Sequence, residues 1–159
     1  MLVHQAKRAE ELFFQKRIPD GETDRITARL WRDQTNLVLV GMPGSGKTTV
    51  GRELARLSGK PFVDLDEEIV KRAGRPIPDI FAQEGEEVFR NLEHEALEEA
   101  CSRSGQVIAT GGGAVLRPEN RTALRRAGRV YRLRRRLEDL PAEGRPLSQA
   151  GKLEEMERL

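Results

Sequence analysis

A short apolar run followed by glycines and a lysine constrains the fold of this chain more than any other feature. The run covers residues 37–40 and stops at Gly41. It is too short and too apolar for a helix on the surface, so it predicts a strand buried on both faces of a parallel sheet. A strand of this kind needs helices on both sides of its sheet, so we expect an α/β fold.

The turn after this strand predicts a site for nucleotide phosphates. Glycines at 41, 44 and 46 let successive backbone N–H groups converge on one anion. Lys47 supplies a mobile cation, Thr48 supplies a hydroxyl that binds a magnesium ion directly, and the helix beginning here adds the positive end of its dipole. A glycine turn without a ligand is the less favoured alternative, because the pattern Gly-x-x-x-x-Gly-Lys-Thr between a strand and a helix is specific. We expect nucleotide contacts from Gly44, Ser45, Gly46, Lys47, Thr48 and Thr49.

Length and composition limit the class of protein. A chain of 159 residues suits one globular domain with an appendage. The formal net charge of +2 by itself points to neither an acidic nor a basic partner. No apolar stretch approaches the roughly 18 residues that span a bilayer, and the polar start of the chain lacks a secretory signal. With a single cysteine, Cys101, no intrachain disulfide can form, so we expect a cytoplasmic protein.

The first 35 residues form a predicted helical extension ahead of the main domain. Apolar side chains in residues 1–17 fall mostly on one stripe, which predicts an amphipathic helix. Proline and Asp-Gly in residues 18–21 predict a break, and a second short helix is expected over residues 23–32. We therefore divide the chain into an extension, residues 1–35, and a main domain, residues 36–159.

Two carboxylates follow the second predicted strand, residues 61–64. Asp64 and Asp66 stand at its carboxyl end, which is where open α/β sheets bind their ligands. Beside a phosphate site, one carboxylate can orient the water shell of a magnesium ion while the other accepts a proton from a hydroxyl. The alternative is helix capping, because residues 66–68 also suit the start of a helix.

The helices of the main domain are predicted from their apolar spacing. Residues 48–57 form a helix with Val50, Leu54 and Leu57 on its buried face, and residues 77–82 form a short helix. Gly85 opens a longer helix to about residue 102, whose buried stripe is Val88, Leu92, Ala96 and Ala100. Cys101 is expected in the core, and His94 is expected to be a solvated helix residue.

Arg90 and Glu93 lie three residues apart on this longer helix. They can form an ordinary surface ion pair of little energetic worth. The functional alternative is that Glu93 holds the guanidinium of Arg90 in place to bind a carboxylate bidentately.

Glycines 111, 112 and 113 follow a third buried strand, residues 106–110, and bring bare backbone to the ligand edge of the sheet. A flexible turn is the alternative. A helix over residues 118–128 and a fourth strand over residues 129–133 come next. Residues 117–136 hold nine arginines and one acid, which we assign to solvated faces near a polyphosphate site rather than to nucleic-acid binding. In the loop at residues 141–147, Arg145 can neutralise a phosphoryl group during transfer.

From about residue 36 onward, these motifs together resemble the shikimate kinases. The similarity rests on five motifs in order: the nucleotide loop (41–49), the paired aspartates (64–66), a substrate segment with Phe81, Gly85, Phe89, Arg90 and Glu93, the glycine triplet (111–113), and the lid sequence Gly-Arg-Pro-Leu (144–147). The resemblance implies a five-stranded parallel sheet of the nucleoside-monophosphate-kinase type. It also implies ATP-dependent phosphorylation of the shikimate 3-hydroxyl, a step in aromatic amino acid biosynthesis.

The resemblance also implies a role for each site residue. Arg90 holds the shikimate carboxylate, while Asp66 and the backbone of Gly112 and Gly113 bind ring hydroxyls. Gly111 is a further substrate-binding residue. Asp66 orients or deprotonates the attacking hydroxyl, and Lys47, magnesium and Arg145 stabilise the transferring group. Asp64 acts on the magnesium ion through water.

Two parts of the chain depart from this family. We expect a main domain that is incomplete at its C-terminal end, because the family continues with a further substrate-binding arginine, an aromatic residue near the nucleotide and a last strand. At the other end, residues 1–6, Met-Leu-Val-His-Gln-Ala, resemble a signature in the last helices of shikimate dehydrogenase. That resemblance implies a fusion to, or an association with, the dehydrogenase.

Two other functions compete with shikimate phosphorylation. One is another small-molecule P-loop kinase, such as a gluconate kinase. The other is a catalytically inactive module that binds a nucleotide without an acceptor.

Overall fold

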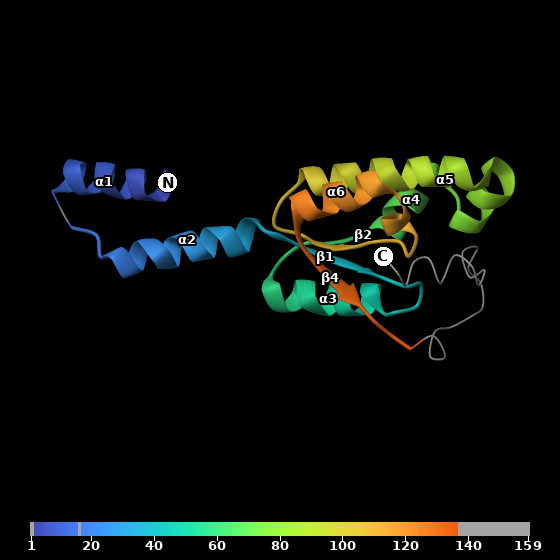
Figure 1. The fold of residues 1–159 in the computed structure, drawn as a ribbon, viewed down its shortest axis with the longest axis horizontal. Helices are drawn as coiled ribbons and strands as arrows, with labels where there is room; N and C mark the ends of the chain where they lie inside the picture. The colour runs from blue at the N-terminus through green and yellow to red at the C-terminus, as the bar shows by residue number, and fades with distance from the viewer. Residues whose placement is uncertain (1, 16, 137–159) are drawn as a thin grey trace. The chain divides into compact units, whose positions relative to one another are not determined.

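The computed structural model describes residues 2–15 and 17–136 of the chain, shown in Figure 1. These residues belong to two compact units, which divide between Gln34 and Thr35. The boundary lies one residue from the predicted division between the extension and the main domain.

The first unit contains two helices, α1 (Leu2–Phe14) and α2 (Asp20–Gln34). Both helices were predicted, but α2 is longer than residues 23–32. It begins at Asp20 because the carbonyl of Pro19 accepts hydrogen bonds from the N–H groups of Glu22 and Thr23. The Asp-Gly pair that predicted a turn therefore lies in the first turn of α2. Several large apolar side chains of this unit are exposed: Leu12, Phe13, Phe14, Ile26, Leu30 and Trp31.

The second unit is built on a parallel sheet whose described strands have the order β2-β3-β1-β4. The strands are β1 (Asn36–Gly41), β2 (Phe62–Asp64), β3 (Val107–Ala109) and β4 (Gly128–Leu133). Val38 is paired with Ile108 of β3 on one side and with Val130 of β4 on the other. All pairings are parallel, so the carboxyl ends of the strands lie at one edge of the sheet.

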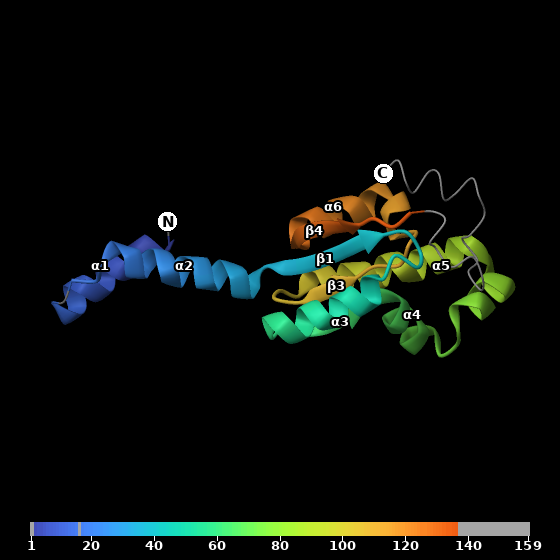
Figure 2. The same ribbon diagram turned by 90° about the horizontal axis from the view of Figure 1, so that it is seen from below.

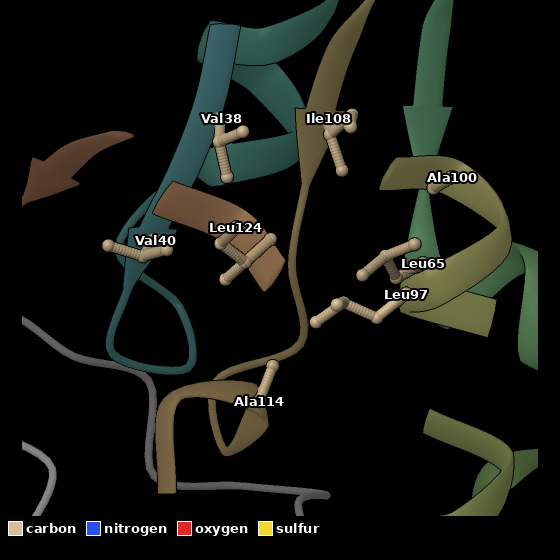
Figure 3. Packing of buried hydrophobic residues seen from close by; sticks show 8 residues of the cluster. All are labelled: Val38, Val40, Leu65, Leu97, Ala100, Ile108, Ala114 and Leu124. Atoms are coloured by element: carbon tan, nitrogen blue, oxygen red, sulfur yellow. The ribbon is translucent and has the colours of Figure 1, made fainter. Parts of the chain in front are cut away.

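Helices cover both faces of this sheet, as the two views of the ribbon show (Figures 1 and 2). Helix α3 (Lys47–Ser58) packs on one face, while α5 (Ile77–Ser102) and α6 (Pro118–Ala127) pack on the other. Side chains along β1 point alternately to the two faces of the sheet. Leu39 contributes to the cluster under α3, and Val38 and Val40 contribute to the cluster under α5 and α6. Figure 3 shows the second cluster, whose buried members are Val38, Val40, Leu65, Leu97, Ala100, Ile108, Ala114 and Leu124.

The buried face of α3 differs from the prediction except at Leu54, which is partly buried against the cluster under this helix. Val50 and Leu57 are exposed, and the buried residues are Lys47, Gly51 and Ala55. A Cβ at Gly51 would lie 2.5 Å from Cε2 of Phe62, so this helix approaches the sheet through its smallest residues. An apolar pattern cannot detect such a face, because it registers large side chains.

Helix α4 (Leu65–Ala73) packs against α5. Gly85 interrupts α5 with a φ of 83° and a ψ of 178°, so the predicted division into a short and a long helix is confirmed. Its buried stripe is shifted from the prediction. Val88 and Leu92 are only partly buried, and the buried residues after the break are Phe89, Arg90, Glu93, Ala96, Leu97 and Ala100.

The part of the chain that the structure describes supplies four strands of this sheet, where the resemblance implies five. The loop at residues 141–147 lies outside the described residues. None of the described helices has the length and apolar character needed to cross a membrane.

Candidate functional site

A cleft of about 510 Å³ lies at the carboxyl edge of the sheet. It is bounded by the loop after β1, the first turns of α3 and α4, parts of α5 and the segment after β3. Its lining comes from segments far apart in the sequence: Pro43, Gly44, Gly46, Lys47, Thr48, Thr49, Asp66, Ile77, Pro78, Phe81, Phe89, Glu93, Thr110, Gly111, Gly112 and Arg135. A parallel sheet places its ligands at this edge.

The loop after β1 has the shape that its glycines predict. Gly46 has a φ of 91°, a left-handed conformation that favours glycine, and α3 begins at the next residue. The Nζ atom of Lys47 donates hydrogen bonds of 2.8 Å to the carbonyls of Gly41 and Met42. The ammonium group is therefore held over the loop, where an anion bound by the backbone N–H groups would meet it.

Asp64 joins the nucleotide loop to helix α4. Its Oδ2 accepts a 2.7 Å hydrogen bond from Oγ1 of Thr48, and its Oδ1 accepts a 3.0 Å bond from the N–H of Asp66. Asp64 is thus the N-cap of α4, while residues 66–68 occupy the first turn. Capping and a functional role are compatible here, since the capping bond uses one oxygen of Asp64 and the hydroxyl of Thr48 uses the other.

The ion pair of Arg90 and Glu93 is buried, so its interpretation as an ordinary surface pair is wrong. Arg90 is 7% exposed and Glu93 is 1% exposed. Nη1 of Arg90 lies 2.6 Å from Oε2 of Glu93, and Nη2 lies 3.4 Å from Oε1 of Glu86. Removing one partner of a buried pair leaves the other charge without compensation, which is strongly destabilising.

Burial raises the pKa of the Glu93 carboxyl above its ordinary value. The charge and hydrogen bond of Arg90 oppose this rise, and the nearby charge of Asp66 adds to it. The cleft therefore holds two acidic groups with different surroundings, one buried against a guanidinium and one in the first turn of α4.

Each glycine of the triplet touches a different part of the site. A Cβ at Gly111 would lie 2.7 Å from Oδ1 of Asp66 and 2.8 Å from Oε1 of Glu93, and one at Gly112 would lie 2.5 Å from Cγ of Pro43. A Cβ at Gly113 would lie 2.6 Å from Nη2 of Arg90. Each of the three glycines is in close contact with another segment, so the interpretation as a flexible turn is wrong.

The structure brings most of the predicted site residues together, but not all. Asp66, Gly111 and Gly112 line the same cleft as five of the six predicted nucleotide contacts. Four other predicted residues are not among those that line the cleft: Ser45, Asp64, Arg90 and Gly113. Arg145 lies outside the described residues.

Sequence reasoning did not place Arg135 in the site. Its Nη1 donates a 3.3 Å hydrogen bond to the carbonyl of Gly44, 91 residues away in the chain. It is one of nine arginines in residues 117–136, and the sequence pattern does not distinguish it from the others. Its position just after β4, whose end lies at the ligand edge of the sheet, is the one signal that could have identified it. Glu93 was expected to hold Arg90 but not to line the cleft itself.

Cys101 and His94 lie away from this cleft. Cys101 is half-buried beside the core, as predicted, and desolvation raises the pKa of its thiol to about 11. His94 is not the solvated residue that was expected, because it is half-buried and its Nδ1 lies 2.7 Å from Oδ1 of Asn120.

Comparison with known families agrees with this geometry. The family model for shikimate kinase matches residues 43–159, which is most of the chain. The chain belongs to the shikimate kinase family. Its parallel sheet with helices on both faces is the α/β fold of the P-loop kinases, as the structures of other family members also show.

Relatives in the shikimate kinase family are similar over the part containing the site. The shikimate kinase of Symbiobacterium thermophilum is 61% identical over 95 residues, which are 60% of this chain and 55% of the relative. The shikimate kinase of Nitrosomonas europaea is 48% identical over 121 residues, 73% of this chain and 57% of the relative. This chain thus spans about half the length of the curated relatives it matches.

Solved shikimate kinase structures superpose on this fold. The structure from Acinetobacter baumannii, in complex with shikimate, has a TM-score of 0.74 at 40% identity and covers 83% of this chain and 79% of its own. The structure from Aquifex aeolicus has a TM-score of 0.70 at 33% identity, covering 78% and 80%.

Proposed function

We propose that this protein transfers the γ-phosphoryl group of ATP to the 3-hydroxyl of shikimate. The observation that carries the proposal is one cleft that contains both a nucleotide loop, with Lys47 and Thr48, and an acidic acceptor side, with Asp66 and Glu93. Family membership supports this assignment, and so does the similarity to a relative solved in complex with shikimate.

The nucleotide half consists of the loop at residues 44–49. Its backbone N–H groups and the start of α3 bind the phosphates, and Lys47 exchanges its carbonyl partners for the outer phosphates. Thr48 and Asp64 suit a magnesium ion, because they place a hydroxyl and a carboxylate oxygen 2.7 Å apart and magnesium takes few protein oxygens besides water and phosphate. In this proposal Thr48 binds the ion directly and Asp64 holds one of its waters. When bound, magnesium neutralises charge on the phosphates.

The acceptor half consists of Asp66, the glycine triplet and the Arg90–Glu93 pair. Each terminal nitrogen of Arg90 bonds one carboxylate, Nη1 that of Glu93 and Nη2 that of Glu86. A guanidinium has five N–H donors, so Arg90 keeps donors for the carboxylate of shikimate. The backbone of Gly111, Gly112 and Gly113 binds ring hydroxyls. Asp66 orients the attacking hydroxyl or accepts its proton.

The transferring group requires positive charge and exact placement more than it requires a strong base, since the transition state of phosphoryl transfer is loose. Lys47 supplies charge from the loop. Arg145 is proposed to supply charge from the lid sequence, on the resemblance alone. Arg135 is proposed as a further cation beside the phosphates, because it lines the cleft and binds the carbonyl of Gly44.

The test is a kinetic assay of the intact gene product. ADP release is coupled to a spectroscopic signal and measured as shikimate is added at a fixed ATP concentration. Shikimate-dependent turnover is expected, and a parallel series with gluconate is expected to give little. Absence of shikimate-dependent turnover, or a preference for gluconate, would overturn the assignment. Nucleotide binding without shikimate binding in calorimetry would indicate an inactive nucleotide-binding module.

We also propose, from residues 1–6 alone, that the first unit corresponds to the end of a shikimate dehydrogenase. The kinase would then be fused to that enzyme or associate with it. Helix α1 begins within this segment, as the resemblance requires. The coding sequence upstream of residue 1 tests this, because a dehydrogenase reading frame is expected there. We also propose a cytoplasmic location, on the composition and the single cysteine of the sequence. Cell fractionation tests it.

A further inference from the structure

The glycine triplet runs directly into a single 3₁₀ turn, η1 (Ala114–Leu116). The N–H of Ala114 donates to the carbonyl of Gly111 at 3.4 Å, and the N–H of Leu116 donates to the carbonyl of Gly113 at 3.0 Å. The triplet and η1 are thus one hydrogen-bonded segment. Whatever fixes η1 also fixes the backbone that faces the acceptor side of the cleft.

Side chains from helix α6 hold all three carbonyls of η1. Nδ2 of Asn120 donates a 2.9 Å bond to the carbonyl of Ala114. Nη1 of Arg121 donates bonds of 2.7 and 3.0 Å to the carbonyls of Val115 and Leu116. A 3₁₀ turn of this length has poor internal hydrogen bonds, so these contacts from neighbouring residues of α6 determine its position.

Asn120 also reaches the helix that carries the ion pair. Its amide nitrogen donates to Ala114, so its Oδ1 is the acceptor in the 2.7 Å contact with Nδ1 of His94, and Nδ1 carries the hydrogen. His94 directly follows Glu93 on α5. Asn120 is fully buried, and a buried amide costs stability unless its groups are bonded; both of its polar atoms have partners.

Asn120 lies between η1 and α5, and the distance between these two elements is small. Gly111 and Gly113 approach Glu93 and Arg90 so closely that a Cβ at either glycine would lie within 3 Å of those side chains. Asn120 fixes the distance between η1, which continues the triplet, and α5, which carries both charged residues. A small displacement of η1 would therefore change the contact between the triplet and the guanidinium.

We infer that Asn120, together with Arg121, is a positioning residue for the acceptor half of the site. Neither residue lines the cleft. They hold the glycine triplet at a fixed distance from Arg90 and Glu93. The carboxylate of the acceptor can then bind Arg90 while its hydroxyls bind the triplet. This inference rests on the proposed function, and it adds residues of α6 that neither the motifs nor the cleft identified.

The test compares Asn120→Asp with a matched core variant in the full-length protein. Asn120→Asp keeps the size of the side chain and an acceptor for His94, but it removes the donor to Ala114. Val107→Ala is the control, because Val107 is fully buried on the opposite face of the sheet, in the cluster under α3. Since Asn120→Asp can impair folding, Arg121→Met is the second variant; it keeps the apolar stem and removes the bonds to Val115 and Leu116.

We expect Asn120→Asp to raise the KM for shikimate about ten- to a hundredfold, the range expected when a site is displaced by up to about 1 Å. Arg121→Met should raise it less. The KM for ATP should change less than about twofold in both, and Val107→Ala should leave both constants near wild type. An unchanged KM for shikimate, or an equal rise in both constants, would overturn the inference.

A second measurement does not depend on the substrate. Hydrogen exchange at the amides of Ala114 and Leu116, which donate to the triplet, should be faster in Asn120→Asp than in Val107→Ala at equal global stability. If wild type shows no shikimate turnover, the proposed function fails, and this exchange measurement still decides the positioning role. Equal exchange in the two variants would refute it.

Discussion

Gly113→Ala tests the acceptor side of the cleft with a single methyl group. The backbone at Gly113 has a φ of −88° and a ψ of −2°, which alanine adopts without strain. A strain-free change from glycine to alanine stabilises a fold by roughly 0.4–1 kcal/mol through the unfolded state. The cost of this variant therefore comes from what the new methyl group meets, which is the guanidinium of Arg90.

The size of the effect follows from the distances. The added Cβ would lie 2.6 Å from Nη2 of Arg90 and closer still to Nη1, whereas ordinary contacts begin at 3.4 Å, so the guanidinium must move by roughly 1 Å. A shift of that size away from Glu93 would break the 2.6 Å bond between them. A hydrogen bond to a charged group contributes about 1.5–3 kcal/mol. If the displaced guanidinium also loses its proposed bond to the acceptor carboxylate, a loss of about 1.5–3 kcal/mol in binding corresponds to a rise of roughly 10- to 150-fold in the KM for shikimate.

The assay measures initial rates over a range of shikimate at saturating ATP, and over a range of ATP at saturating shikimate. Gly113→Ala should raise the first KM and leave the second nearly unchanged. Gly112→Ala is the informative comparison, because its Cβ would meet Pro43 of the nucleotide loop and should affect ATP. Gly21→Ala, with nothing within 4 Å of its Cβ, is the neutral control. A KM for shikimate within twofold of wild type in Gly113→Ala would refute the placement of the acceptor carboxylate at Arg90.

Three further perturbations separate the parts of the site. Asp66→Asn should lower kcat by about 10²-fold or more while calorimetry finds ATP affinity unchanged; an unaltered kcat would remove Asp66 from its role. The raised pKa of Glu93 means that its contribution to stability is full below its ordinary pKa of 4.5 and is lost as pH rises through the raised value. In Glu93→Gln, the free energy of unfolding should therefore decline less than in wild type between pH 4.5 and neutrality, and parallel pH profiles would contradict this. Arg135→Gln should raise the KM for ATP up to about fivefold, as expected for an exposed charge, and the effect should shrink with salt; an equal change in the neighbouring Arg134→Gln would show that it is not specific.

Features set by neighbouring residues were predictable from the sequence. The strand at 37–40, the glycine loop and the helix at 48–57 follow from a local pattern. The strand is present as Asn36–Gly41, and the helix is present as Lys47–Ser58, one residue longer at each end. The break at Gly85 was predictable for the same reason, since its φ of 83° favours glycine. The order of these elements was enough to place Lys47, Thr48 and Asp66 at one edge of a parallel sheet.

Features set by contacts across the sequence were not predictable in the same way. The spacing of Arg90 and Glu93 predicts an ion pair, but its burial depends on Gly111 and Gly113, which belong to another segment. The buried face of α3 depends on the ring of Phe62, which fills the space left by Gly51. In both cases a glycine allows another segment to approach the backbone closely, and the sequence does not show which segment that is.

The glycine triplet shows why three such residues are needed in succession. Gly111 meets the carboxylates of Asp66 and Glu93, Gly112 meets Pro43 of the nucleotide loop, and Gly113 meets Arg90. A side chain at the first or third position would displace Asp66, Glu93 or Arg90, whereas one at the second would displace the loop after β1. The triplet is therefore where the two halves of the cleft touch. Under the proposed function, its middle residue would set how closely a phosphoryl donor and its acceptor can approach.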